Sequence, residues 1–264
     1  RGLPVTVVTP DDEEVGGKAV SNFTKRGKRQ YFSLKMDAPV PPGSFGYWGF
    51  PGYEKKGHVV HTKGADNLGS CAALLALLDD LRPAKVRRPV ACLFTRAEEE
   101  GFQGAQAAVM SGLLSRKSLV VVLETSKEFP GGKMGLGPVI RVADRALSFD
   151  PRVTFWIERA VRKGLAAKRL KKVQRAVMGG GMCEAGLYTL MGYRCSALAI
   201  PLGNYHNDGG KRVLPEFIDL RDWQGLVALL QELARTLLTP EGLERAWKKK
   251  LAARFERGYM ERWS

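Results

Sequence analysis

The sequence has no continuous apolar run of the ~18–20 residues that a membrane-spanning helix requires. We expect no signal peptide either. Cysteine is scarce, and the sequence contains no Cys-x-x-Cys pair, which argues against a zinc knuckle and a disulfide framework. We therefore expect no membrane partner, reduced thiols and a cytoplasmic protein. The cysteines are Cys71, Cys92, Cys183 and Cys195.

Acidic side chains are outnumbered, with 27 Asp and Glu against 42 Lys and Arg and a net charge of +15. The basic residues concentrate at residues 162–175 and 245–262, where apolar residues such as Leu165 and Trp247 are interleaved with them. This charge balance would suit nucleic acid or an anionic surface, but no nucleic-acid-binding motif accompanies it. We interpret both clusters as solvated helix faces and expect no nucleic-acid partner.

The sequence does contain a regular alternation of strand and helix patterns after a Gly- and Pro-rich beginning. Residues 1–53 show short alternating runs without a helical period and predict a small β-rich unit. Residues 54–264 predict an α/β domain with a doubly wound mixed sheet and helices on both faces. The predicted strands lie at 59–60, 90–95, 119–123, 139–142, 173–177 and 196–200, and the predicted helices at 70–81, 104–114, 151–167, 185–191, 220–238 and after residue 240.

The stretch VACLFTRAEEEGFQGA, residues 90–105, ends a predicted buried strand in three consecutive glutamates. Open α/β sheets bind their ligands at the carboxyl ends of strands. Adjacent carboxylates repel one another and lose hydration when they are covered, so a bound cation would stabilise them. The alternative is a solvated turn before a helix, whose N-terminal dipole favours glutamate.

Three further polar clusters follow predicted strands, so a doubly wound sheet would bring them to the same crevice. Asp66 precedes a helix in KGADNLGS, Glu124 ends the apolar strand LVVVLE, and His206 follows another strand in PLGNYHND. Singly, they are also explained as a helix cap, a surface carboxylate and an ordinary loop histidine. Together with the glutamates, they form the carboxylate and imidazole ligand set of Zn²⁺ and its first-row neighbours.

Five motifs occur in order within residues 57–208, namely KGADNLGSCAALLALL, FTRAEEEGFQGA, VVLETSK, GLGPVIRVADR and IPLGNYHN. In this order they resemble the co-catalytic, di-zinc metallopeptidases that include the glutamyl and tetrahedral aminopeptidases. The resemblance implies a zinc-peptidase-like fold and hydrolysis of N-terminal peptide bonds. It also implies two divalent metals as cofactors, Zn²⁺ first, with Co²⁺ or Mn²⁺ as alternatives.

The resemblance also implies roles for individual residues. Asp66 corresponds to the aspartate that bridges the two metals, and Glu98 to the general base that takes a proton from water. Glu99 corresponds to a ligand of one metal, Glu124 to a ligand of the other, and His206 to a histidine ligand. Two metals that share a water lower its pKa and polarise the scissile carbonyl.

Two more expectations come from the same resemblance. Glu100 takes a variable position of the family motif and is expected to be a bystander. Family members place a cis peptide bond after the bridging aspartate, so the bond between Asp66 and Asn67 is expected to be cis.

The Gly-rich stretch GGGMCE, residues 179–184, resembles the substrate loop of the family. Gly180 and Gly181 are therefore candidates for substrate binding, and Glu184 is a candidate partner for a substrate ammonium group. A purely structural turn explains this stretch equally well.

One family motif has no counterpart in the sequence. The family carries an HxD motif, which supplies a histidine to one metal, on the amino-terminal side of an inserted β-rich domain. Residues 1–53 resemble the later part of that insert, which is often used for self-assembly. Because residue 1 is Arg and not Met, we expect the chain to begin inside a longer protein. His61 is the candidate for a substitute ligand.

Two functions therefore remain open. The first is a metallo-aminopeptidase or related amidohydrolase that acts on peptides as a homo-oligomer. The second is a non-catalytic or one-metal relative that acts as a binding or assembly protein.

Overall fold

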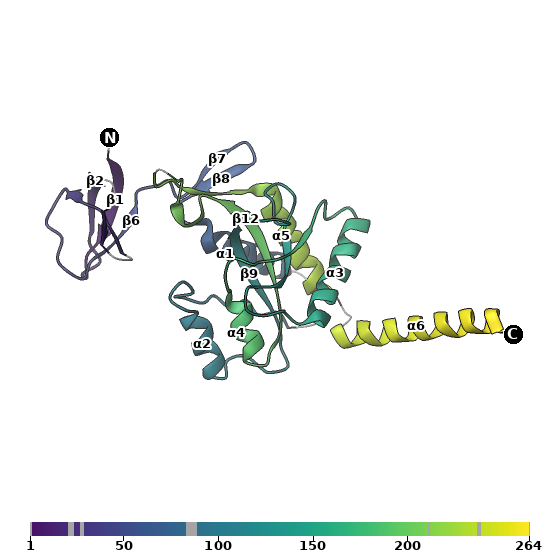
Figure 1. Cartoon of the computed structure of the whole chain (residues 1–264). Coiled ribbons are helices and arrows are strands. Elements are labelled where there is room, and N and C mark those ends of the chain that lie inside the picture. The colour runs from purple at the N-terminus through teal and green to yellow at the C-terminus, as the bar shows by residue number, and fades with distance from the viewer. Residues whose placement is uncertain are drawn as a thin grey trace.

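The structure is a computed structural model of the 264-residue chain (Figure 1). It describes residues 2–20, 24–26, 29–82, 89–210, 212–236 and 239–263. Within these ranges, residues 24–26, 29–30 and 256–263 are described by their backbone alone.

A small antiparallel sheet forms the amino-terminal part of the chain and stands to one side of a larger body (Figure 1). It has four strands in the order β5-β2-β1-β6, and alternation in β1 buries Val5 and Val7 on one face. A separate hairpin, β3–β4, precedes β5. The strands are β1 (Leu3–Val8), β2 (Glu14–Ala19), β3 (Thr24–Arg26), β4 (Arg29–Tyr31), β5 (Leu34–Met36) and β6 (Phe45–Trp48). The division of the chain between residues 53 and 54 stays a prediction.

The larger body is built on a seven-stranded mixed sheet in the order β11-β10-β12-β13-β8-β7, with β9 paired to β12. The long central pair β9 and β12 runs parallel, whereas β10 and β13 pair with β12 in antiparallel fashion. The strands are β7 (Glu54–Lys56), β8 (Val59–Thr62), β9 (Leu119–Lys127), β10 (Val139–Ala143), β11 (Gln174–Val177), β12 (Arg194–Gly203) and β13 (Glu216–Asp219).

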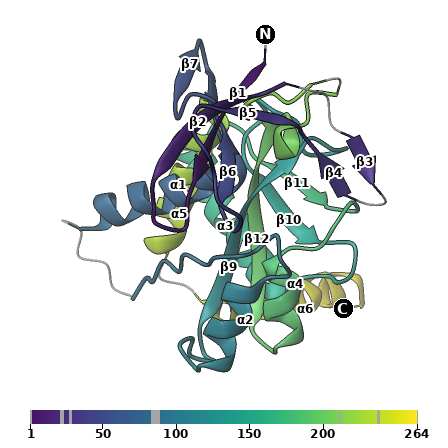
Figure 2. The same cartoon turned by 90° about the vertical axis from the view of Figure 1, so that its left-hand side faces the viewer.

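Helices cover both faces of this sheet, as predicted (Figure 2). Leu123 and Leu198 pack in one core cluster with residues of α1, α3 and α5, whereas Val122 and Ala197 pack in another with residues of α2 and α4. Neighbouring residues of a strand point to opposite faces of the sheet. A continuously apolar strand is therefore buried only when helices cover both faces. The helices are α1 (Ala65–Leu81), α2 (Gln103–Met110), α3 (Pro151–Ala166), α4 (Glu184–Leu190), α5 (Leu220–Ala234) and α6 (Pro240–Trp263), and a 3₁₀ turn, η1, covers Tyr205–Asn207.

The local sequence explains where α3 begins. Asp150 accepts hydrogen bonds from the N–H groups of Arg152 and Val153, and Pro151 occupies the first helical turn. α6 packs against α3 near its beginning, where the rings of Phe155 and Trp247 meet edge to face. The rest of α6 projects away from the body (Figure 1).

The predicted strand at residues 90–95 is wrong. Residues 89–95 are irregular, and β9 is hydrogen-bonded to β12 alone among the strands that the structure describes. Val90 is 38% exposed and Phe94 is 46% exposed. An apolar pattern indicates a preference for burial, but a strand also requires a neighbour with free backbone groups, and the pattern does not provide one.

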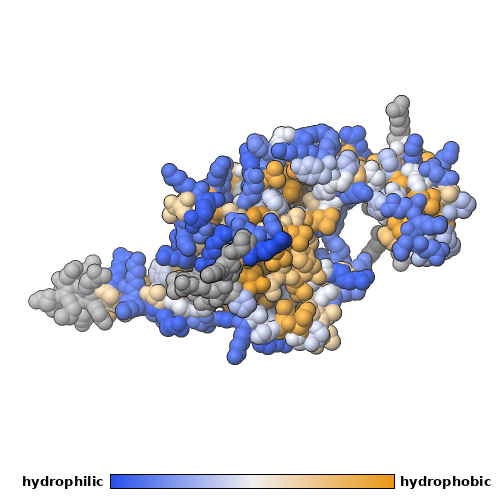
Figure 3. All heavy atoms as spheres, turned by 180° about the vertical axis from the view of Figure 1, so that it is seen from behind, coloured by the Kyte–Doolittle hydropathy of each residue, from blue (hydrophilic) through white to orange (hydrophobic). Residues whose placement is uncertain are grey.

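Apolar surface gathers in the middle of the body on the face seen from behind (Figure 3). α1 contributes exposed leucines to the molecular surface, namely Leu68, Leu75 and Leu78. Within the described ranges, no helix combines the length and the apolar character needed to cross a membrane. The four cysteines are free thiols, in agreement with the sequence analysis.

Candidate metal centre

Asp66 lies at the junction of β8 and α1, where the backbone departs from helical geometry. The peptide bond between Asp66 and Asn67 is cis, as predicted. The Asp66 N–H donates to Glu216 Oε2 at 2.9 Å, and Asp66 Oδ1 accepts a hydrogen bond from the hydroxyl of Thr125 at 2.8 Å. Asp66 and Asn67 have non-helical backbone angles, so the regular part of α1 begins after them. Among the described residues, the Asp66 carboxylate accepts the Thr125 hydroxyl and no N–H of α1, so it does not act as a helix cap.

His206 lies in η1, directly after the central strand β12. Its backbone adopts a left-handed conformation with φ of 56°, and its N–H donates to Glu216 Oε1 at 2.8 Å. The imidazole stacks on the ring of Tyr205 with a centroid distance of 3.8 Å. These contacts turn the Nε2 atom toward the carboxylates of Asp66 and Glu99.

Glu99 lies in a tight turn before α2. The carbonyl oxygen of Glu98 accepts hydrogen bonds from the N–H groups of Gly101 and Phe102, which closes the turn. The chain then returns past Arg96, where a Cβ atom on Gly104 would lie 2.6 Å from the Arg96 nitrogen and oxygen. Glycine at position 104 therefore allows the close approach that places the glutamates beside the sheet.

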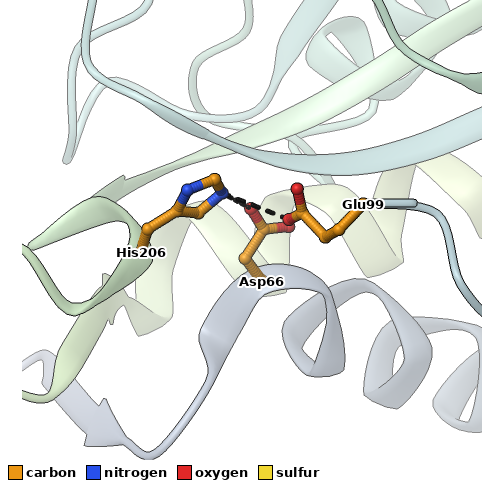
Figure 4. Close-up of side chains that lie close together, drawn as sticks. All are labelled: Asp66, Glu99 and His206. Carbon is orange, nitrogen blue, oxygen red and sulfur yellow. Dashed lines mark hydrogen bonds and ion pairs between the residues drawn. The ribbon is translucent and has the colours of Figure 1, made fainter. Parts of the chain in front are cut away.

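Asp66, Glu99 and His206 form a cluster in which one ligand atom from each residue lies within 4.8 Å of the others (Figure 4). His206 Nε2 is 3.1 Å from Glu99 Oε1 and 4.0 Å from Asp66 Oδ2. Two carboxylates and an imidazole are the donors that Zn²⁺ and related divalent cations bind. The residues present therefore fit a divalent metal.

Glu98 and Glu124 are not members of this three-residue cluster, but they share its electrostatic environment. Burial raises the pKa of Glu98 to about 7, and the negative charge of Glu99 adds to the rise. Burial likewise raises the pKa of Glu124 to about 8, and that of Asp66 to about 6. A bound divalent cation would favour the ionised form of each carboxylate and reverse these shifts.

The candidate substrate residues lie around the beginning of α4. Glu184 is the first residue of α4, and it accepts a hydrogen bond from the Thr95 hydroxyl at 2.7 Å. The Gly181 carbonyl oxygen accepts a hydrogen bond from the N–H of Arg145, whereas Gly180 is exposed. The negative charge of Glu184 also raises the pKa of Glu98, so this helix end lies within electrostatic range of the turn.

His61 is not a member of the cluster. It lies in β8, and its ring is 5.3 Å from that of Phe217 on the paired strand β13. Its Nδ1 atom is buried and has no hydrogen-bond partner in the described part of the chain. Its role as a substitute ligand stays a prediction.

Glu216 and Thr125 contact the cluster but are not among the residues predicted from the sequence. Glu216 is buried, and its two carboxylate oxygens join the backbones of Asp66 and His206. An acidic residue at the start of the apolar run EFIDL was the available signal. Thr125 follows Glu124 in the motif VVLETSK, but no local sequence pattern indicates that its hydroxyl reaches Asp66.

Comparison with known proteins matches the chain to a peptidase family. The sequence profile of the M42 glutamyl aminopeptidases matches residues 35–222, which is more than half of the chain. A putative aminopeptidase from Acetivibrio thermocellus is 26% identical over 157 residues. This match covers 58% of the present chain and 46% of the relative, so the chain spans less than half the length of this curated relative.

Solved structures with the same fold include an assembled peptidase. The Pyrococcus horikoshii TET1 peptidase, which can assemble into a tetrahedron or a large octahedral shell, superposes with a TM-score of 0.71 at 22% identity, over 89% of this chain and 72% of that one. The TET aminopeptidase of a marine sediment Thaumarchaeota archaeon has a TM-score of 0.73 at 20% identity, over 89% and 71%. These similarities support the fold, and the profile match shows that the chain belongs to the M42 glutamyl aminopeptidase family.

Proposed function

We propose that the protein is a metal-dependent aminopeptidase that hydrolyses N-terminal peptide bonds. The observation that carries the proposal is the convergence of Asp66, Glu99 and His206 beside Glu98 in a chain of the M42 family. A carboxylate and imidazole cluster next to a further half-buried carboxylate provides both a metal site and a proton acceptor.

In this proposal two divalent metals bind, with Zn²⁺ preferred and Co²⁺ or Mn²⁺ as alternatives. Asp66 would bridge them, Glu99 and His206 would hold one side, and Glu124 would hold the other. When bound, the metals would polarise the scissile carbonyl and lower the pKa of water. His61 is retained as a candidate for the remaining ligand position.

Glu98 is the proposed general base. It is half-buried beside the cluster, and a bound cation would keep its carboxylate ionised and able to accept a proton. It would take a proton from water and deliver it to the leaving amine. The turn closed by Gly101 and Phe102 would hold the base in position.

Glu184 is the proposed partner for the substrate's N-terminal ammonium group, beside a loop that includes Gly180 and Gly181. The Thr95 hydroxyl fixes one oxygen of Glu184 and leaves the other for a ligand. A carboxylate held in this way favours a free amino terminus, which would make the enzyme an aminopeptidase and not an endopeptidase.

The assembled shells of a structural relative support a further proposal, that the chain works as a homo-oligomer. We also propose a cytoplasmic location, because cysteine is scarce and no Cys-x-x-Cys pair occurs in the sequence. A second candidate function is a one-metal relative with a binding or assembly role. It is favoured by one observation: Asp66 Oδ1 already accepts a hydrogen bond from Thr125, which leaves Oδ2 nearest to His206.

The test is hydrolysis of amino-acid anilides and short peptides by the intact protein loaded with Zn²⁺, Co²⁺ or Mn²⁺. We expect Glu98→Gln to lower kcat by about 10²–10⁴-fold, the usual contribution of a general base. The matched control is Glu100→Gln in the same turn, which should retain activity. Absence of turnover with every metal, together with one bound metal per chain, would favour the second candidate.

A further inference from the structure

A cavity of about 750 Å³ lies where the amino-terminal sheet meets the larger body. Most of its wall comes from residues between positions 5 and 48, and Lys63 and Asn207 of the larger body line it as well. Ligand sites in proteins are concave, of this size and mostly apolar, with a few polar groups that fix the orientation of the ligand. The proposed reaction uses no residue of this cavity.

The wall is apolar because the strand pattern places apolar side chains on one face of the sheet. Val5 and Val7 of β1 are buried, and the strand register puts Trp48 opposite Val5 and Gly46 opposite Val7. The ring of Trp48 meets that of Phe32 edge to face, with a centroid distance of 5.0 Å. A Cβ atom on Gly46 would lie 3.1 Å from Cγ2 of Val7, so glycine keeps this part of the wall open. A wall of this kind fits an apolar side chain, an aromatic one above all.

β6 is an edge strand that leaves backbone groups unpaired beside the cavity. The Gly49 N–H donates to the Pro4 carbonyl oxygen at 2.8 Å, and hydrogen-bonded positions alternate along an antiparallel pair of strands. The N–H groups of Gly46 and Trp48 therefore point away from β1, and they have no hydrogen-bond partner among the residues that the structure describes. An open strand edge beside an apolar pocket binds an extended peptide, because the main chain pairs with the edge and a side chain enters the pocket.

Lys63 provides a positive charge at the cavity. Its ammonium group lies over the ring of Tyr47, 4.2 Å from the centroid. The Tyr47 hydroxyl donates to Glu14 at 3.0 Å, but Lys63 forms no ion pair with a carboxylate within the described ranges. The aromatic ring thus holds the ammonium group beside the apolar wall, where it can pair with an anionic group of a ligand.

The cavity adjoins the two loops that carry candidate metal ligands. Asn207 follows His206 directly, and its side-chain amide donates to the Lys63 carbonyl oxygen at 3.1 Å. Lys63 in turn lies three residues before Asp66. A peptide whose amino-terminal residue lies at the metal cluster therefore has the cavity within reach of its following residues.

The carboxyl-terminal end of a peptide combines the three features that these groups recognise, namely an extended main chain, a side chain and a carboxylate. We propose that the cavity binds this end of a peptide substrate, with an apolar side chain against Trp48 and Phe32 and the carboxylate at the Lys63 ammonium group. The proposal names the substrate class as short peptides with an apolar carboxyl-terminal residue. It rests on the proposed function in one respect, because it takes the bound peptide as the substrate.

Calorimetry with N-acetylated tripeptides and the metal-free full chain tests the site without hydrolysis, because the acetyl group removes the free amino terminus. Acetyl-Ala-Ala-Phe should bind about 10-fold more tightly than acetyl-Ala-Ala-Ala, as expected for burial of an aromatic ring. The free acid should bind about 5-fold more tightly than its carboxamide, the upper range for an exposed ion pair. Equal affinities for all of these peptides, or no binding of any of them, would overturn the proposal.

Variants of the cavity assign each preference to a residue. Lys63→Met should remove the preference for the acid over the carboxamide and keep the preference for Phe over Ala, whereas Trp48→Leu should do the opposite. The matched control is Lys55→Met, which removes the same charge from an exposed lysine of β7 outside the cavity. An acid preference that survives in Lys63→Met, or that falls equally in Lys55→Met, would overturn the role of Lys63. If Trp48→Leu fails to fold, the comparison of peptides on the unmodified protein still decides.

A second copy of the chain is the alternative occupant of an apolar wall with an open strand edge. In that case the peptides would show no preference, and Trp48→Leu would lower the mass of the protein measured by light scattering. This result would overturn the proposal in favour of an interface between copies.

Steady-state kinetics of the Zn²⁺-loaded protein separates this inference from the proposed function. Lys63→Met should raise KM for peptide acids about 5-fold and leave kcat unchanged, because Lys63 contacts only the far end of the substrate. Hydrolysis that depends neither on the carboxyl-terminal residue nor on its charge would overturn the inference and leave the proposed function standing. Selective binding of the acetylated peptides without hydrolysis of free ones would leave the cavity as a peptide site and refute the proposed function alone.

Discussion

The main-chain N–H of His206 donates a hydrogen bond of 2.8 Å to the carboxylate of Glu216. The other oxygen of the same carboxylate accepts the N–H of Asp66 at 2.9 Å. One buried side chain on β13 therefore fixes the relative position of two loops that carry candidate metal ligands. The separation of those ligands therefore depends on a residue outside the cluster.

Glu216→Gln should weaken metal binding. The amide has one oxygen and cannot accept both N–H groups, so one loop loses its anchor and a buried donor is left unpaired. We expect about 10-fold weaker Zn²⁺ binding, measured by calorimetry. The control is Glu128→Gln, because Glu128 accepts the N–H of Met134 in an exposed loop. Equal affinities for both variants would refute the bridging role of Glu216.

The metal-free protein should lose stability as the pH rises from about 5 to 8. Folding raises the pKa values of Asp66, Glu98 and Glu124 to about 6, 7 and 8. In this window the folded state binds more protons than the unfolded state, so the free energy of unfolding falls as the pH increases. Urea unfolding at several pH values measures the slope.

Saturating Zn²⁺ should remove most of this dependence of stability on pH. The metal displaces the protons from these carboxyl groups and keeps them ionised in the folded state. Glu98→Gln and Glu124→Gln should each reduce the slope in the metal-free protein. A metal-free protein that becomes more stable between pH 5 and 8 would contradict the prediction.

Gly104→Ala should damage the turn that carries Glu98 and Glu99. The new Cβ atom would lie 2.6 Å from backbone atoms of Arg96, so the turn must shift. We expect lower metal affinity and a lower unfolding midpoint in thermal scans. Gly52→Ala is the matched control, since a Cβ atom there meets nothing within 4 Å. Equal behaviour of the two variants would show that the close approach at position 104 is unimportant.

Glu184→Gln should raise KM for peptides while Zn²⁺ affinity stays unchanged, if Glu184 binds the substrate ammonium. Thr95→Val should cause a smaller rise, because the hydroxyl at 2.7 Å only orients that carboxylate. Thr189→Val in the same helix is the control, since the Thr189 hydroxyl bonds to the Ala185 carbonyl oxygen within α4. Steady-state kinetics with di- and tripeptides separates KM from kcat. A loss confined to kcat would argue against ammonium binding.

The sequence predicted much of the fold because hydrophobic periodicity is a local property. The apolar run before Glu124 became β9, and the leucine pattern after Asp66 became α1. The same reasoning failed at residues 90–95, where strand formation depends on a neighbour and not on the segment itself. The convergence of Asp66, Glu99 and His206 was expected from the motifs and is present in the structure.

The parts of the site that could not be predicted depend on register. Glu216 reaches Asp66 because β13 pairs with β8. The Arg141 side chain of β10 reaches Ser126 of β9 because the strand between them, β12, has alanine opposite Arg141. No spacing along the chain encodes either contact. To predict either contact, one must know which strands are neighbours and which residues lie opposite one another on them.

The hydrogen bond between Glu216 and Asp66 joins residues 150 positions apart in the chain. The entropy of closing so long a loop must be lost before this contact contributes any stability, so we expect it to form after the local contacts of the helices. The cluster of Asp66, Glu99 and His206 should therefore appear only once β13 has joined β8. Metal capture would then report on the pairing of β13 with β8, and separation of these two strands would abolish metal binding before the helices unfold.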